Sequence, residues 1–220
     1  MLLSLNERRQ RRERRSRIRL ILISASVGHL GWGAILPYQY VYASQARGWG
    51  QLVAALAAGL FSVGSLVGSP LFGRVADGRR PERVLMAAQA FAAAACLGLL
   101  ASGSPPWFCL SSLIFGLGMM GAAPAKSVLV LHWTPAAAHR RVFAYRFAGE
   151  SIGMASGAVV SGLLVDVTHP DGMTPAYVIG ALSLSTALAV SAWAAHRALS
   201  AWPTASSTLS TSAWSGPCGC

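Results

Sequence analysis

The chain has 220 residues, of which 54% are hydrophobic and only 11% are charged, with a mean hydropathy of +0.49 and a formal net charge of +11. Soluble domains carry roughly 25% charged residues. So few charges cannot cover the surface of a soluble protein, so the composition excludes soluble globular, disordered and collagen-like classes. The sequence indicates an integral membrane protein.

Long stretches without charge recur along the chain. A membrane-spanning helix needs roughly 20 apolar residues, and the turn-forming residues of 102–106 divide the longest stretch into two. The first span is too long for a cleaved signal peptide. The sequence therefore predicts an all-α, polytopic fold with six transmembrane helices, at about 20–46, 50–73, 84–102, 107–131, 142–165 and 174–196.

Two polar segments flank the predicted bundle of residues 20–197. The first, 1–19, contains eight arginines. The second, 198–220, is a polar tail rich in Ser and Thr, which we interpret as the start of a linker or as an out-of-frame segment.

The basic residues indicate the direction of the chain through the membrane. Fifteen of the eighteen lie in 1–19, 74–83, 140–141 and at Arg197, which a six-span topology places on one side. The opposite loops contain only Arg47. Because basic residues mark cytoplasmic loops, we expect a multi-pass plasma membrane protein with both termini in the cytoplasm.

This distribution also accounts for the net charge. An arginine run before a first span is usually a topology signal that contacts anionic lipid heads, so we expect no nucleic-acid partner. All basic residues but Lys126 are arginine. Together with the many alanines, this bias indicates a GC-rich bacterial genome, and the membrane would then be the inner membrane.

The second and fifth spans are related by an internal repeat at an offset of 89 residues. Both segments place small residues four apart, as close helix packing in lipid requires, and the predicted topology gives them opposite directions. We therefore expect two inverted three-helix repeats, the architecture of secondary transporters. The identical positions are Ser62, Gly64, Gly68, Gly73, Asp77 and Pro81, matched by Ser151, Gly153, Gly157, Gly162, Asp166 and Pro170.

These segments resemble a known family. Residues 73–83, with Gly73, Asp77, Arg79, Arg80 and Arg83, resemble the G-x-x-x-D-[RK]-x-G-[RK]-[RK] loop of the major facilitator superfamily. The helix-packing motif formed by Gly153, Gly157 and Gly162 resembles a glycine pattern that proton-coupled exporters of that superfamily carry in the fifth span, and Leu36-Pro37-Tyr38 is also typical. The resemblance covers residues 20–197, which is one six-helix half of the usual twelve-helix protein.

The resemblance implies a secondary active transporter that works by alternating access, with proton-coupled export of a small molecule as the form that the exporter pattern favours. One bundle supplies one wall of the transport cavity. The chain is thus expected to be an incomplete, inactive half, or to pair as a homodimer or with a separate C-terminal half. No nucleotide-binding loop is present, and we expect no cofactor, metal site or catalytic residue.

The resemblance also assigns a gating role to the loop between the second and third spans. In the family the loop aspartate, here Asp77, pairs with basic groups and with a helix end of the other half. The alternative is a solvated loop whose arginines, Arg79, Arg80 and Arg83, only fix the topology.

The fifth span contains two charged residues that can form an ion pair. Arg146 and Glu150 are four residues apart, on one face of a helix, and charges within a span usually face a polar interior. Glu150 could bind a proton or a polar substrate, or the pair could be structural. Lys126 is a further candidate, which snorkelling to the interface also explains.

Three residues of the first span could line a cavity, namely His29, Tyr38 and Gln39. A histidine that bonds a neighbouring helix is equally compatible with the sequence. Outside the transporter class, Gly149-Glu150-Ser151-Ile152-Gly153 fits the G-x-S-x-G pattern of serine hydrolases. An intramembrane serine protease, or a membrane interaction protein without transport activity, is therefore the alternative.

Overall fold

The protein is built from six long helices in the computed structural model, which describes residues 2–78 and 80–200, with side chains except at 2–11, 13 and 197–200. All six are long and apolar enough to cross a membrane. The helices are α1 (Leu2–Val41), α2 (Gly50–Gly78), α3 (Pro81–Leu100), α4 (Pro105–Trp133), α5 (His139–Leu164) and α6 (Thr174–Ser200). The all-α, six-helix fold predicted from the sequence is confirmed.

Glycine and proline set the ends of several helices. A π-helical turn, Tyr42–Ala46, extends α1, and the chain then reverses through Gly48 and Gly50, whose φ angles of 63° and 84° suit glycine. Proline occupies the first turn of α3 and of α4, where the missing N–H costs no hydrogen bond.

Several helices extend beyond the apolar windows in the sequence. α1 includes the basic segment from Leu2, and α2 continues to Gly78 although the apolar window ends at residue 73. The loop predicted over 74–83 is therefore much shorter, since α3 already begins at Pro81. The length of an apolar window reflects the thickness of the bilayer, whereas a helix continues until residues that disfavour helix end it. Residues 201–220 of the predicted tail lie outside the described part of the chain.

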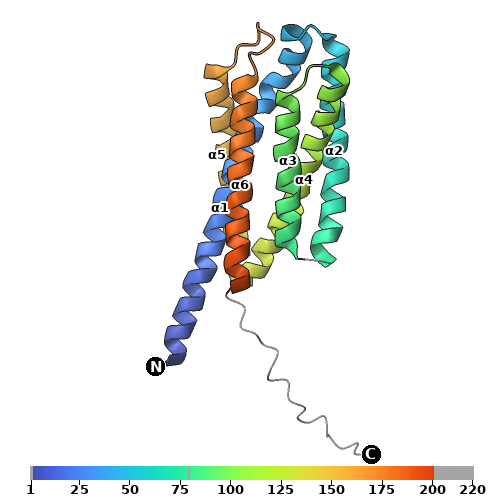
Figure 1. The fold of residues 1–220 in the computed structure, drawn as a ribbon. Helices are drawn as coiled ribbons and strands as arrows, with labels where there is room; N and C mark the ends of the chain where they lie inside the picture. The colour runs from blue at the N-terminus through green and yellow to red at the C-terminus, as the bar shows by residue number, and fades with distance from the viewer. Residues whose placement is uncertain (1, 79, 201–220) are drawn as a thin grey trace, which may run out of the picture.

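Helices of each three-helix half pack mainly against helices of the other half. α2 and α3 pack against α4, whereas α5 and α6 pack against α1, and α3 contacts α6 (Figure 1). Replacing α1, α2 and α3 by α4, α5 and α6 leaves this set of contacts unchanged. The packing thus has the symmetry expected of the two predicted repeats.

Glycines form the closest crossings, and they do so at equivalent places in both repeats. A Cβ on Gly153 or Gly157 would overlap the carbonyl oxygen of Ser26 or Leu30 in α1. In the same way, a Cβ on Gly64 or Gly68 would overlap the carbonyl oxygen of Leu113 or Leu117 in α4. Leu113 and Leu117 each lie 87 residues after their counterparts in α1, as Pro124 lies after Pro37. The sequence repeat therefore extends to α1 and α4.

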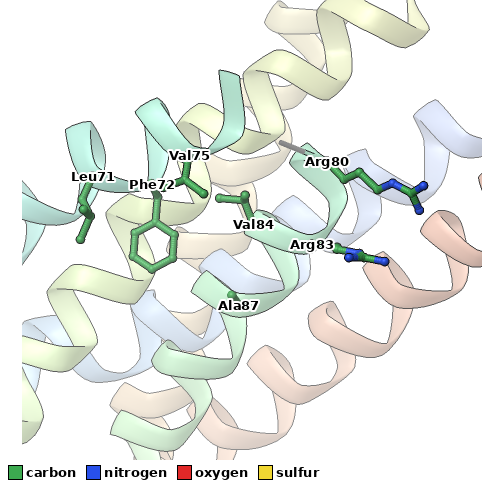
Figure 2. A pocket seen from close by; sticks show the side chains of 7 residues that line it. All are labelled: Leu71, Phe72, Val75, Arg80, Arg83, Val84 and Ala87. Atoms are coloured by element: carbon green, nitrogen blue, oxygen red, sulfur yellow. The ribbon is translucent and has the colours of Figure 1, made fainter. Parts of the chain in front are cut away.

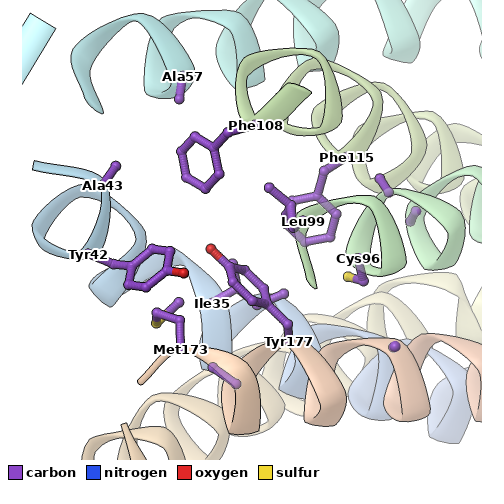
Figure 3. Packing of buried hydrophobic residues seen from close by; sticks show 14 of the residues in the cluster. Ile35, Tyr42, Ala43, Ala57, Cys96, Leu99, Phe108, Phe115, Met173 and Tyr177 are labelled. Carbon is purple, nitrogen blue, oxygen red and sulfur yellow. The ribbon is translucent and has the colours of Figure 1, made fainter. Parts of the chain in front are cut away.

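A buried aromatic cluster holds the helices together toward the end of the bundle remote from the termini (Figure 3). Tyr42 lies edge-on to Tyr177 at 6.1 Å between ring centroids, and its ring is 6.5 Å from that of Phe108. The Tyr42 hydroxyl donates to the carbonyl oxygen of Pro170 and accepts from Arg47 Nε, at 2.7 Å each. Arg47 also donates to the carbonyl oxygen of Ser102. Arg47 therefore ties together the three connections at this end.

Except for Arg146, the other arginines of the described residues lie toward the opposite end of the molecule (Figure 1). The start of α1, the end of α6 and the α2–α3 and α4–α5 connections lie together there (Figure 1). We call this the basic end, and it includes Arg74, Arg80, Arg83, Arg140 and Arg141.

The glycine crossings predict a symmetric sensitivity to substitution. We expect Gly157→Val and Gly68→Val each to destabilise the bundle by about 3 kcal/mol or to prevent folding, because the new side chain meets backbone that cannot move aside. Thermal unfolding in detergent measures the effect.

Gly59→Val is the matched control, since a Cβ there meets nothing within 4 Å. Its stability should stay within about 0.5 kcal/mol of the wild type. Equal tolerance of all three substitutions would contradict the close crossings.

Candidate functional site

Three charged side chains meet in the interior of the bundle, between α4 and α5. Arg146 Nε donates to Glu150 Oε1 at 2.9 Å, and Lys126 Nζ lies 3.8 Å from the same oxygen. Arg146 also donates from Nη1 to Ser127 Oγ at 2.9 Å. Only 4% of Lys126, 4% of Arg146 and 8% of Glu150 is exposed. We refer to these three residues as the charge cluster.

The helices place the charge cluster at an intermediate depth. Glu150 lies near the middle of α5, about 16 Å from its first residue at the usual helical rise. Arg146 is one turn closer to the basic end. The buried face of α5 consists of Arg146, Glu150, Gly153, Gly157 and Ser161, so the charges continue the stripe whose glycines contact α1.

The ion pair predicted between Arg146 and Glu150 therefore forms, and Lys126 joins it. The alternative for Lys126, an ammonium that snorkels to the interface, does not describe this structure, because the side chain is buried beside Glu150. Nothing in the sequence shows that contact, since Lys126 and Glu150 come from different helices.

The charge cluster contains more positive than negative charge. Two cationic side chains share one carboxylate, and both contacts use the same oxygen, Oε1. Removing an ion from water costs several kcal/mol, which only a close opposite charge offsets. With its three side chains ionised, the arrangement has room for a further negative charge.

Aromatic residues of α1 and α2 lie beside the charge cluster. His29 lies close enough to Lys126, Arg146 and Glu150 to interact with all three electrostatically. Its Nδ1 is 2.9 Å from the carbonyl oxygen of Ala25 on its own helix, so it bonds no neighbouring helix through that atom. Trp32 packs edge-on to His29 at 5.5 Å and stacks on Phe61 at 6.4 Å.

Trp32 was not predicted as a site residue. Its buried Nε1 has no acceptor among the described residues. The signal that could have found it is its spacing of three residues from His29, which places both on one face of α1.

Tyr38 and Gln39 make contacts between helices. The Tyr38 hydroxyl donates to the carbonyl oxygen of Ala158 in α5 at 3.0 Å, where Gly162 leaves room for it. Gln39 Nε2 donates to Ser112 Oγ in α4 at 2.8 Å and is buried. These contacts give both side chains a packing role, and neither contacts the charge cluster.

The predicted gating residues lie at the basic end of α2 and α3. Gly73 packs near Pro124 of α4, and Asp77 is exposed in the last turn of α2. Arg80 and Arg83 are exposed at the start of α3. Arg79 lies outside the described residues.

Asp77 differs from Asp166, its counterpart in the second repeat. Asp166 accepts hydrogen bonds from the backbone N–H and the hydroxyl of Thr168, which hold the pKa of this carboxyl below its ordinary value. Within the described residues, Asp77 has no hydrogen bond or ion pair. It also lies at a helix C-terminus, where a negative charge is unfavourable.

The family comparison decides between the classes of membrane protein. The model of the Major Facilitator Superfamily matches residues 21–216. The chain belongs to the Major Facilitator Superfamily. No curated protein gives a significant match. Since members of this superfamily are membrane transporters, the chain is a multi-pass membrane protein of a transporter family, as the sequence motifs predicted.

The hydrolase pattern lies in unsuitable geometry. Ser151 is exposed within the continuous helix α5, whereas a nucleophile elbow needs a sharp turn between a strand and a helix. The described residues also contain no group of three His, Cys, Asp or Glu side chains that could hold a metal ion.

The charge imbalance predicts opposite effects for two substitutions in the charge cluster. Glu150→Gln leaves two buried cations without a counter-charge, and we expect it to destabilise the bundle by about 3 kcal/mol. Lys126→Met removes the excess charge at similar volume and should leave the stability unchanged or higher. Thermal unfolding in detergent at neutral pH compares them.

Asp171→Asn, at an exposed acidic position of the opposite end, is the control and should change little. If Lys126→Met costs as much as Glu150→Gln, the ammonium is a required partner of the carboxylate and the charge is not in excess.

Proposed function

We propose that this protein acts in secondary active transport by alternating access and couples export of a small molecule to proton entry. The observation that carries the proposal is the charge cluster at mid-depth in a Major Facilitator bundle. Ionisable residues inside a membrane are costly and usually serve substrate or proton movement.

Glu150 is the proposed proton site. When ionised, its carboxylate neutralises Arg146 and draws Lys126 toward it. Protonation would remove that negative charge and leave both cations free to hold another group. An anionic substrate group and the ionised carboxylate would therefore compete for the same two cations, so that substrate binding and protonation of Glu150 depend on each other. His29, with Trp32 beside it, is the proposed α1 wall of this site.

A second six-helix bundle would complete the transport cavity. α2 and α5 are the least buried of the helices and expose apolar faces, so we propose that these faces pack against the second bundle. That bundle is a second copy of this chain or a separate C-terminal half. The exposed side chains include Leu52, Leu56, Val63 and Leu66 of α2 and Ile152, Val159 and Leu163 of α5.

We propose that the basic end faces the cytoplasm of a bacterial cell, with the bundle in the plasma membrane. The arginines of this end follow the distribution that orients membrane proteins. Asp77, which has no partner among the described residues, would then close the cytoplasmic side by pairing with the second bundle.

Transport by reconstituted protein tests the coupling. The probes are ethidium, lactose and benzoate, one cationic, one neutral and one anionic, offered to proteoliposomes with an acidic lumen. Where a second copy of the chain supplies the other bundle, we expect saturable, protonophore-sensitive uptake of at least one probe, and Glu150→Gln should abolish the pH-driven part while downhill flux persists.

Asp171→Asn should behave as the wild type in the same assay, because this residue lies far from the charge cluster. Unchanged pH-driven uptake by Glu150→Gln would assign the carboxylate a structural role. The absence of saturable uptake for all three probes would contradict transport of these classes by the reconstituted chain.

The role of Asp77 is tested by separating stability from flux. Asp77→Asn removes an unfavourable charge from a helix C-terminus, so the bundle should become more stable by about 0.3–1 kcal/mol. Flux should nonetheless fall at least tenfold if the side chain pairs across the bundles. Retained flux with raised stability would show that Asp77 is only a solvated side chain at the end of α2 and has no gating role.

A further inference from the structure

A cleft opens between α2 and α3 at the basic end. Its volume is about 620 Å³, within the range of small-molecule sites. Apolar residues of both helices form most of its lining, and two arginines stand at one side (Figure 2). The lining residues are Leu71, Phe72 and Val75 of α2, with Arg80, Arg83, Val84 and Ala87 of α3.

The cleft follows from the way the helices pack. α2 and α3 each pack mainly on α4 and touch each other little, so a gap remains between them. Phe72 is fixed at its side, because its ring lies edge-on to Phe91 at 6.1 Å and closely contacts Gly121 of α4. Packed helices therefore form the walls of the cleft, and no long loop contributes to them.

The charged and the apolar lining residues of the cleft are separated along the helix axis. Ala87 lies seven residues after Arg80 and thus about 10 Å deeper toward the middle of the bundle. Leu71 and Val75 expose 51% and 39% of their surface. In Figure 2 the guanidinium groups of Arg80 and Arg83 extend the same way, from one side of the apolar walls. An occupant must therefore be charged at one end and apolar below it.

The charge of that end must be negative. Neither Arg80 nor Arg83 forms an ion pair with a carboxylate of the described residues. In residues 74–83 four arginines face two acidic residues, Asp77 and Glu82. The α5 face that a second bundle would present has no exposed carboxylate, since Glu150 is buried. A helix without an exposed carboxylate would leave Arg80 and Arg83 without a negatively charged partner.

We propose that this cleft binds an anionic phospholipid, with an acyl chain between α2 and α3 and the phosphate on Arg80 and Arg83. Basic pockets between membrane helices on the cytoplasmic side suit such head groups. The proposal rests on the proposed cytoplasmic placement of the basic end in a membrane, and it does not depend on transport or on the charge cluster.

Native mass spectrometry of the purified full chain tests the proposal, with phosphatidylglycerol and phosphatidylcholine as the lipid probes. We expect phosphatidylglycerol to bind preferentially and Arg80→Gln/Arg83→Gln to weaken its binding about tenfold or more. The matched control is Arg140→Gln/Arg141→Gln, which removes two exposed arginines of the same end away from the cleft. Equal loss in both variants would show a diffuse electrostatic attraction and overturn the site.

A second variant tests the apolar part of the cleft without touching its charge. Ala87→Trp should fill the cleft and lower phosphatidylglycerol binding, whereas Ala90→Trp, exposed on the same helix outside the lining, should not. Unchanged binding in Ala87→Trp would overturn the acyl-chain placement.

Two further measurements distinguish other occupants. Glycerol 3-phosphate should bind far more weakly than the lipid, and equal binding would make the arginines a site for free phosphate. The oligomeric state of Arg80→Gln/Arg83→Gln should match that of the wild type. A shift from dimer to monomer with unchanged lipid binding would make the cleft a protein interface and overturn the proposal.

Discussion

The contact of glycine with backbone carbonyl is the constraint on which this bundle depends. Gly153 and Gly157 bring α5 against α1, and Gly64 and Gly68 bring α2 against α4. In lipid the hydrophobic effect contributes little between helices, and close van der Waals packing takes its place. Because the two crossings are equivalent, one interaction type holds both repeats. It also orients the face of α5, and hence the side chains that continue the glycine stripe.

The repeats share a backbone arrangement but not a chemistry. By the two offsets, Lys126 corresponds to Gln39, Arg146 to Ala57 and Glu150 to Phe61. One repeat thus carries three charges where the other carries an amide, a methyl and a ring. Phe61 stacks on Trp32, while Gln39 bonds to Ser112. The aspartates diverge as well, because Asp166 accepts hydrogen bonds within its own loop, whereas Asp77 has none from the described residues. Symmetric packing therefore supports a charge cluster built in one repeat only.

The sequence predicts well whatever is local or periodic. Six spans follow from long apolar stretches, the repeat from glycine spacing, and the Arg146–Glu150 pair from its four-residue separation. The sequence does not predict which helix faces which, because packing and not hydropathy sets the rotation of each helix. Lys126 of α4 contacts Glu150 of α5, and Tyr38 of α1 bonds to α5, and neither contact could be predicted. The extension of α2 to Gly78 was missed for a related reason, since polar residues continue a helix after the apolar window has ended.

These asymmetries suggest how a symmetric fold can perform directional work. A bundle whose repeats were chemically identical would present the same groups toward both membrane faces. Here one end contains most arginines and an aspartate that has no partner among the described residues, while at the other end Arg47 binds Tyr42 and Ser102. Arg47 makes its hydrogen bonds within the bundle, whereas Arg80 and Arg83 of the basic end form no ion pair with a carboxylate of the described residues. Partners from outside the bundle can therefore act on the basic end through these charges.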